Sequence, residues 1–118
     1  MNRDYSTLLP QTLDKLFPEA ALRKKVVGIL EAYGREEFHR EVERVHLGIL
    51  RLSGANLEMI EQHTNLACSD FRDLLIAAEY PLTFGKKALK EKDPAKYAKL
   101  EKKEREQYDQ WLARVLAA

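Results

Sequence analysis

Apolar residues recur at helical spacing along most of this chain. The clearest example is the segment of residues 35–53, where apolar residues follow one another at intervals of four and three: Phe38, Val42, Val45, Ile49 and Leu52. This spacing predicts an amphipathic helix with one apolar face. Val45, Leu47 and Ile49 also alternate as they would in a strand, but helical spacing covers the whole segment, so it decides the assignment.

Similar patterns predict helices before and after this segment. One helix is expected from Pro18 to the residue before Gly34, because proline suits the first position of a helix and glycine its end. A hairpin over residues 35–66, followed by a helix over residues 69–80, is expected to form the centre of the fold. The last of these helices should bury three residues against the first apolar stripe: Phe71, Leu74 and Leu75.

A long C-terminal helix is predicted from Pro94, because Asp93 is a good N-cap and nothing breaks the pattern as far as about Leu116. Its apolar stripe is interrupted at Glu104 and consists of Tyr97, Leu100, Tyr108, Trp111 and Val115. The chain is therefore predicted to be an all-α, single-domain bundle of about five helices. We expect a helical core over residues 1–82, a basic linker over residues 83–93 and a charged helix over residues 94–118 that either docks on the core or projects from it.

The charge is small overall but unevenly distributed. The formal net charge is +1, yet residues 35–82 carry five positive and nine negative side chains (−4), whereas residues 83–118 carry ten and six (+4). A net charge near zero argues against a strongly basic nucleic-acid-binding protein. The basic tail either pairs with the acidic body of its own chain or meets an acidic partner.

Cysteine content and hydropathy indicate the compartment. The single cysteine, Cys68, cannot form an intramolecular disulfide, which suits a reducing environment. The first residues lack the apolar region of a secretory signal. The longest apolar run, LLIAA, is too short to cross a bilayer. We therefore expect a cytoplasmic protein that has no membrane association.

Residues 57–79 fit part of the helix-turn-helix pattern. With Asn65 in the turn, its apolar positions are occupied by Ile60, Leu66, Phe71 and Leu74. Glu61, however, stands where a small residue normally lets the two helices cross. The second helix would also present Asp70 and Asp73 to DNA phosphates, which repel carboxylates. We expect two packed core helices, and keep DNA binding by residues 57–79 as the alternative function.

Candidate chemistry is sparse. Glu-x-x-His occurs twice, as Glu36 with His39 and as Glu43 with His46, the spacing found in di-iron carboxylate bundles. Those bundles take the motif from separate helices, whereas both copies here lie on one predicted helix about 10 Å apart. We therefore expect no metal, and expect both histidines to flank the apolar stripe as half-buried residues.

Covalent and cofactor chemistry find no support in the sequence either. Cys68 precedes a predicted helix, but a nucleophile also needs a base, and the neighbouring Asp70 and Asp73 disfavour a thiolate. The motifs of phosphate-binding loops and of serine hydrolases do not occur. The sequence thus predicts no enzyme and no cofactor.

The segment RVHLGILRLSGANLEMIEQHTNLACSDFRDLLIAAEYP, residues 44–81, resembles a group of small bacterial proteins of uncharacterised function. The resemblance implies a bacterial origin and a helical fold. The residues themselves favour a non-enzymatic module that acts through protein contacts, either with a partner or with its own copy, and nucleic acid is not an expected partner. The expected interaction residues lie on the C-terminal helix: Tyr97, Leu100, Tyr108 and Trp111.

Overall fold

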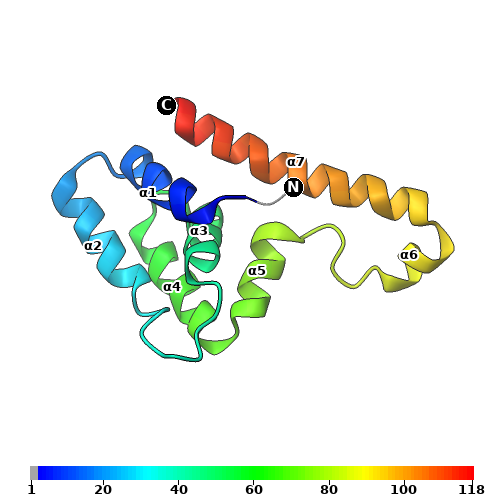
Figure 1. The fold of residues 1–118 in the computed structure, drawn as a ribbon, viewed down its shortest axis with the longest axis horizontal. Coiled ribbons are helices and arrows are strands. Elements are labelled where there is room, and N and C mark those ends of the chain that lie inside the picture. The colour runs from blue at the N-terminus through cyan, green and yellow to red at the C-terminus, as the bar shows by residue number, and fades with distance from the viewer. Residues whose placement is uncertain (1–2) are drawn as a thin grey trace.

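The computed structural model describes residues 3–118, in which all regular structure is helical. This confirms the all-α prediction, although seven helices form rather than about five (Figure 1). They are α1 (Tyr5–Leu16), α2 (Ala20–Leu30), α3 (Val42–Ser53), α4 (Leu57–Ser69), α5 (Phe71–Glu79), α6 (Lys87–Lys92) and α7 (Pro94–Ala117).

α3 is the central helix of the fold. It packs against α1, α4 and α5, and all six residues from position 45 to position 50 are buried. The apolar alternation at Val45, Leu47 and Ile49 therefore reflects burial of several sides of this helix and not a strand. A helix that is covered on several sides needs apolar residues around more of its circumference than a helix on the surface.

A glycine allows α3 and α5 to approach each other closely. A Cβ atom at Gly48 would lie 3.1 Å from Cδ1 of Leu74 and 3.2 Å from Cβ of Ala78. On α5, Leu74 and Leu75 are buried and Phe71 is half-buried against the same core, as the apolar pattern predicted.

The central helix begins later than the sequence pattern indicates. α3 starts at Val42, and the segment 35–41 forms turns and bends. Phe38 consequently lies on the surface with 69% of its area exposed, so the prediction that it joins the core is wrong. The other residues of the predicted stripe do pack in the core or against it: Val42, Val45, Ile49 and Leu52.

Local side-chain contacts explain this late start. The ring of His39 stacks on that of Tyr33 with centroids 4.3 Å apart, and its Nδ1 accepts the N–H of Gly34 at 2.7 Å. The hydroxyl of Tyr33 donates to the carbonyl of Arg40 at 2.7 Å and accepts its N–H at 3.1 Å. These bonds offer the backbone an alternative to helix, and Glu41, the residue before α3, has a left-handed conformation with a φ of 52°.

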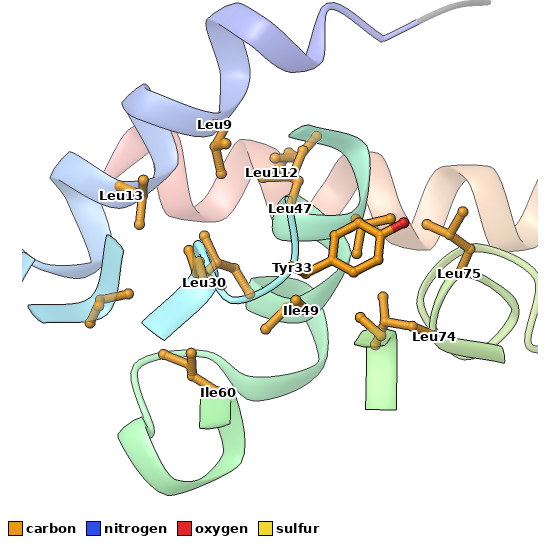
Figure 2. Close-up of a cluster of buried hydrophobic side chains, with 14 of the residues drawn as sticks. Leu9, Leu13, Leu30, Tyr33, Leu47, Ile49, Ile60, Leu74, Leu75 and Leu112 are labelled. Carbon is orange, nitrogen blue, oxygen red and sulfur yellow. The ribbon is translucent and has the colours of Figure 1, made fainter. Parts of the chain in front are cut away.

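The C-terminal helix both docks and projects. Tyr108 and Leu112 of α7 are buried in the same cluster as Leu9 and Leu47. Figure 2 labels Leu9, Leu47 and Leu112 of this cluster. The first turns of α7 instead lie beside α6 and extend away from the body, which makes the molecule 51 Å long (Figure 1). The segment predicted as a linker, residues 83–93, contains α6, and α6 is the second helix of this projection.

Candidate functional site

A polar cleft lies where α7 meets the body. It encloses about 600 Å³ between the N-terminal segment, the start of α3, the end of α5 and the middle of α7. Arginine and glutamate side chains form most of its wall.

A buried ion pair forms the side of the cleft that belongs to the body. Glu79, only 6% exposed, accepts three hydrogen bonds from Arg44: Nη2 to Oε1 at 2.6 Å, Nε to Oε2 at 2.8 Å and Nε to Oε1 at 3.1 Å. Arg44 also pairs with Glu41 and donates to the hydroxyl of Tyr80 at 2.8 Å. The bond to Glu79 raises the pKa of Arg44 above its usual value. The two charges compensate each other, so Glu79 is not free to act on a ligand.

Glu104 holds α7 to the segment that follows α5. The residue that interrupts the predicted stripe is only 4% exposed. Its Oε2 accepts the N–H groups of Leu82 and Thr83, both at 3.1 Å, and its Oε1 accepts the hydroxyl of Thr83 at 2.6 Å. A buried carboxylate needs such partners, and here they fix the point from which α6 and the first turns of α7 project.

Tyr108 and Trp111 lie at the docked end of α7. Tyr108 is 1% exposed, with the guanidinium of Arg3 4.0 Å from its ring centroid and the Trp111 ring edge-on at 5.8 Å. Burial raises the pKa of Tyr108, and its hydroxyl has no hydrogen-bond partner among residues 3–118. The sequence-based prediction placed Tyr108 in an intermolecular contact, but its side chain is enclosed by its own chain. Trp111 is half-buried and packs against the core.

The cleft offers no reactive constellation. Its two buried carboxylates, Glu79 and Glu104, already have protein partners, and no histidine or cysteine lies among its lining residues. Across residues 3–118, no three His, Cys, Asp or Glu side chains lie close enough together to bind a metal ion.

The histidines and the cysteine that the sequence singled out lie apart from the cleft. His46 is buried and its Nε2–H donates to the carbonyl of Tyr33 at 2.7 Å, so it is an interior residue rather than one at the edge of a stripe. His39 lies in the turn before α3, stacked on Tyr33. Cys68 is exposed near the end of α4.

The segment with a partial helix-turn-helix pattern is part of the body. α4 and α5 both pack on α3, as expected. Asp70 alone separates them, whereas a helix-turn-helix has a turn of three or four residues. Its carboxylate accepts the N–H groups of Arg72 at 3.0 Å and Asp73 at 3.4 Å, which begins α5 with negative charge at its exposed end. No observation in this segment favours DNA binding.

A second candidate site is the projection formed by α6 and the first turns of α7. We call it the arm and define it as residues 84–103. Every lysine in it is exposed: Lys86, Lys87, Lys90, Lys92, Lys96, Lys99, Lys102 and Lys103. Against these eight lysines stand three acidic residues, Glu91, Asp93 and Glu101, so the net charge of the arm is +5.

Two of the predicted interaction residues stabilise this arm. Tyr97 and Leu100 are half-buried, whereas Lys99 and Lys103 are exposed. The ammonium of Lys90 on α6 lies 5.4 Å from the ring centroid of Tyr97, within the range of a cation–π contact. The sequence pattern predicted Tyr97 and Leu100 as interaction residues. It did not show that α6 and α7 lie side by side and carry their lysines on one projection.

Comparison of the chain with protein-family models, with curated proteins and with solved structures finds no match. The resemblance of residues 44–81 to small bacterial proteins therefore stays a prediction. Within the described residues, no helix combines the length and the apolar character needed to cross a membrane.

Proposed function

We propose that this chain is a non-enzymatic interaction module, and that its contact surface is the lysine-rich arm. The observation that carries the proposal is the placement of eight exposed lysines on a two-helix projection with a net charge of +5. Lysine ammonium groups held away from the body attract an acidic surface and accelerate encounter with it. The proposed partner is therefore an acidic protein surface.

The rest of the structure supports such a role by holding the arm in place. Glu104 ties α7 to Leu82 and Thr83, while Tyr108 and Leu112 anchor its C-terminal half in the core. The arm is thus connected to the body by buried contacts rather than by a flexible linker. A preorganised surface loses less conformational entropy on binding than one that must first become ordered.

The test is to map where a partner binds. Zero-length carbodiimide crosslinking in a lysate of the source cells joins lysine ammonium groups to carboxylates in contact, and mass spectrometry identifies both partner and position. We expect crosslinks to concentrate on arm lysines. The double variant Lys99→Gln with Lys103→Gln should recover less of the identified partner.

A matched control uses two lysines outside the arm. Lys24 and Lys25 on α2 are also exposed, so Lys24→Gln with Lys25→Gln removes the same charge elsewhere. Crosslinks spread evenly over both lysine pairs, with equal partner recovery by both double variants, would contradict the proposal.

A further inference from the structure

We infer that the acidic surface which the arm contacts belongs to a second copy of this chain, namely the exposed side of α4 and the start of α5. The inference rests on the proposed function, because it names the partner of the same arm. Copies would then associate head to tail.

The first argument is that the opposite charges of the chain do not neutralise each other within one molecule. Residues 35–82 have a net charge of −4 and the arm has +5. Among residues 3–118, no arm lysine forms an ion pair with the body. The one arm lysine within 4.0 Å of a carboxylate is Lys102, which lies 3.9 Å from Glu106 on its own helix. The arm lysines therefore lack the ion pairs that pairing of the arm with its own body would require.

The second argument is the location of the unpaired acidic residues. We call Glu58, Glu61, Asp70 and Asp73 the acidic face; all four are exposed, and none of them forms an ion pair within the described chain. Arg72 is the one basic residue in this stretch. These residues together with Arg72 therefore have a net charge of −3, and their four carboxylates have no ion-pair partner among residues 3–118.

The third argument is that the two surfaces match in spacing and in apolar content. Lys99 and Lys103 are one helical turn apart on α7, and Glu58 and Glu61 are one turn apart on α4, so two pairs can form side by side. Each surface also exposes one large apolar residue. Phe84 at the base of the arm is 64% exposed, and Leu66 on α4 is 36% exposed. A contact that covers both adds apolar burial to the ion pairs.

The two surfaces are different parts of the molecule, so their contact is heterologous. Such a contact produces a closed ring or an open chain rather than a two-fold dimer. Exposed ion pairs are weak and screened by salt. The expected behaviour is a salt-sensitive association that grows with concentration.

A charge-swap experiment on the full chain tests the inference. One variant carries Lys99→Glu and Lys103→Glu on the arm, and the other carries Glu58→Lys and Glu61→Lys on the acidic face. Sedimentation velocity is measured over a range of concentrations in about 10 mM and about 1 M salt, where the Debye length is roughly 30 Å and 3 Å. Thermal melts by circular dichroism verify that each variant is folded.

The expected result has three parts. The parent protein should associate at low salt and become monomeric at high salt. Each variant alone should remain monomeric, because like charges then face each other. An equimolar mixture of the two should associate again, since both contacts between unlike variants join opposite charges. Lys24→Glu with Lys25→Glu should associate like the parent.

Two outcomes would overturn the inference. The first is a parent protein that stays monomeric at every concentration at low salt, and the second is a mixture of variants that fails to associate. If copies stay apart while an identified protein still crosslinks to the arm, the self-association fails and the proposed function stands. If the arm instead retains duplex DNA in a salt-dependent manner, both are replaced by a polyanion-binding role.

Discussion

Replacing Glu104 with leucine would leave three donors without an acceptor: the N–H groups of Leu82 and Thr83 and the hydroxyl of Thr83. A hydrogen bond to a charged acceptor contributes roughly 1.5–3 kcal/mol. Leu82 is half-exposed, so water can replace its lost bond, whereas Thr83 is only 7% exposed and loses both of its bonds. We therefore expect Glu104→Leu to lower the free energy of unfolding by about 3–5 kcal/mol, a large part of the ~5–15 kcal/mol of a typical domain.

The assay is equilibrium unfolding in urea, followed by two signals. Trp111 is the single tryptophan of the chain and lies on the docked half of α7, so its fluorescence reports docking, while circular dichroism reports total helix. Glu106→Leu is the matched control, because Glu106 is exposed and should change stability by less than about 0.5 kcal/mol. Glu104→Gln retains one acceptor oxygen and should fall between the parent and Glu104→Leu. If Glu104→Leu unfolds within about 1 kcal/mol of the parent, the network does not hold α7 and the reasoning fails.

Three further predictions follow from packing and titration. Gly48→Leu should lower the free energy of unfolding by about 1–3 kcal/mol, because its side chain would overpack against α5. Gly28→Ala on the exposed side of α2 should raise the free energy of unfolding by up to about 1 kcal/mol. Thermal melts in which both variants shift the melting temperature in the same direction would contradict this. Phe71→Ala should lower the free energy of unfolding by about 2 kcal/mol, less than the ~3–5 kcal/mol lost at a fully buried phenylalanine. Phe38→Ala should change it by less than about 0.5 kcal/mol, because Phe38 is exposed. Equal losses for the two variants in urea unfolding would refute the assigned exposure of these side chains. Burial lowers the pKa of His46 below its usual 6.5, so the unfolded chain binds more protons and the free energy of unfolding should fall as the pH drops below about 6.5. His46→Gln should flatten that slope, and an unchanged slope would assign the effect to other groups.

The sequence alone determined the fold class and most helices, because helical spacing and caps are local signals. Asp93 before Pro94 predicted the start of α7, and the side chain of Asp93 does accept the N–H of Lys96. The charge asymmetry between body and tail was also readable from composition. These features depend on residues near one another in the chain, so they need no knowledge of the tertiary contacts.

The start of α3 and the role of Glu104 were decided by contacts between distant or competing groups. The pattern through Phe38 is as helical as the pattern after it, but the stacking of His39 on Tyr33 and the bonds at Arg40 hold the segment in turns. Glu104 interrupts an apolar stripe in sequence, and its burial is compensated by hydrogen-bond donors of Leu82 and Thr83, which lie 22 and 21 residues away.

The candidate interaction surfaces, too, were in part readable from the sequence and in part decided by the tertiary structure. Tyr108 has the pattern of an interaction residue, yet Arg3 and the core enclose it, since only the folded chain brings the N-terminus to α7. The lysines of the arm are obvious in the sequence, but whether they pair with the acidic body depends on where α6 and α7 direct them. Within the described residues the arm lysines form no ion pair with that body, and the carboxylates of the acidic face have no ion-pair partner.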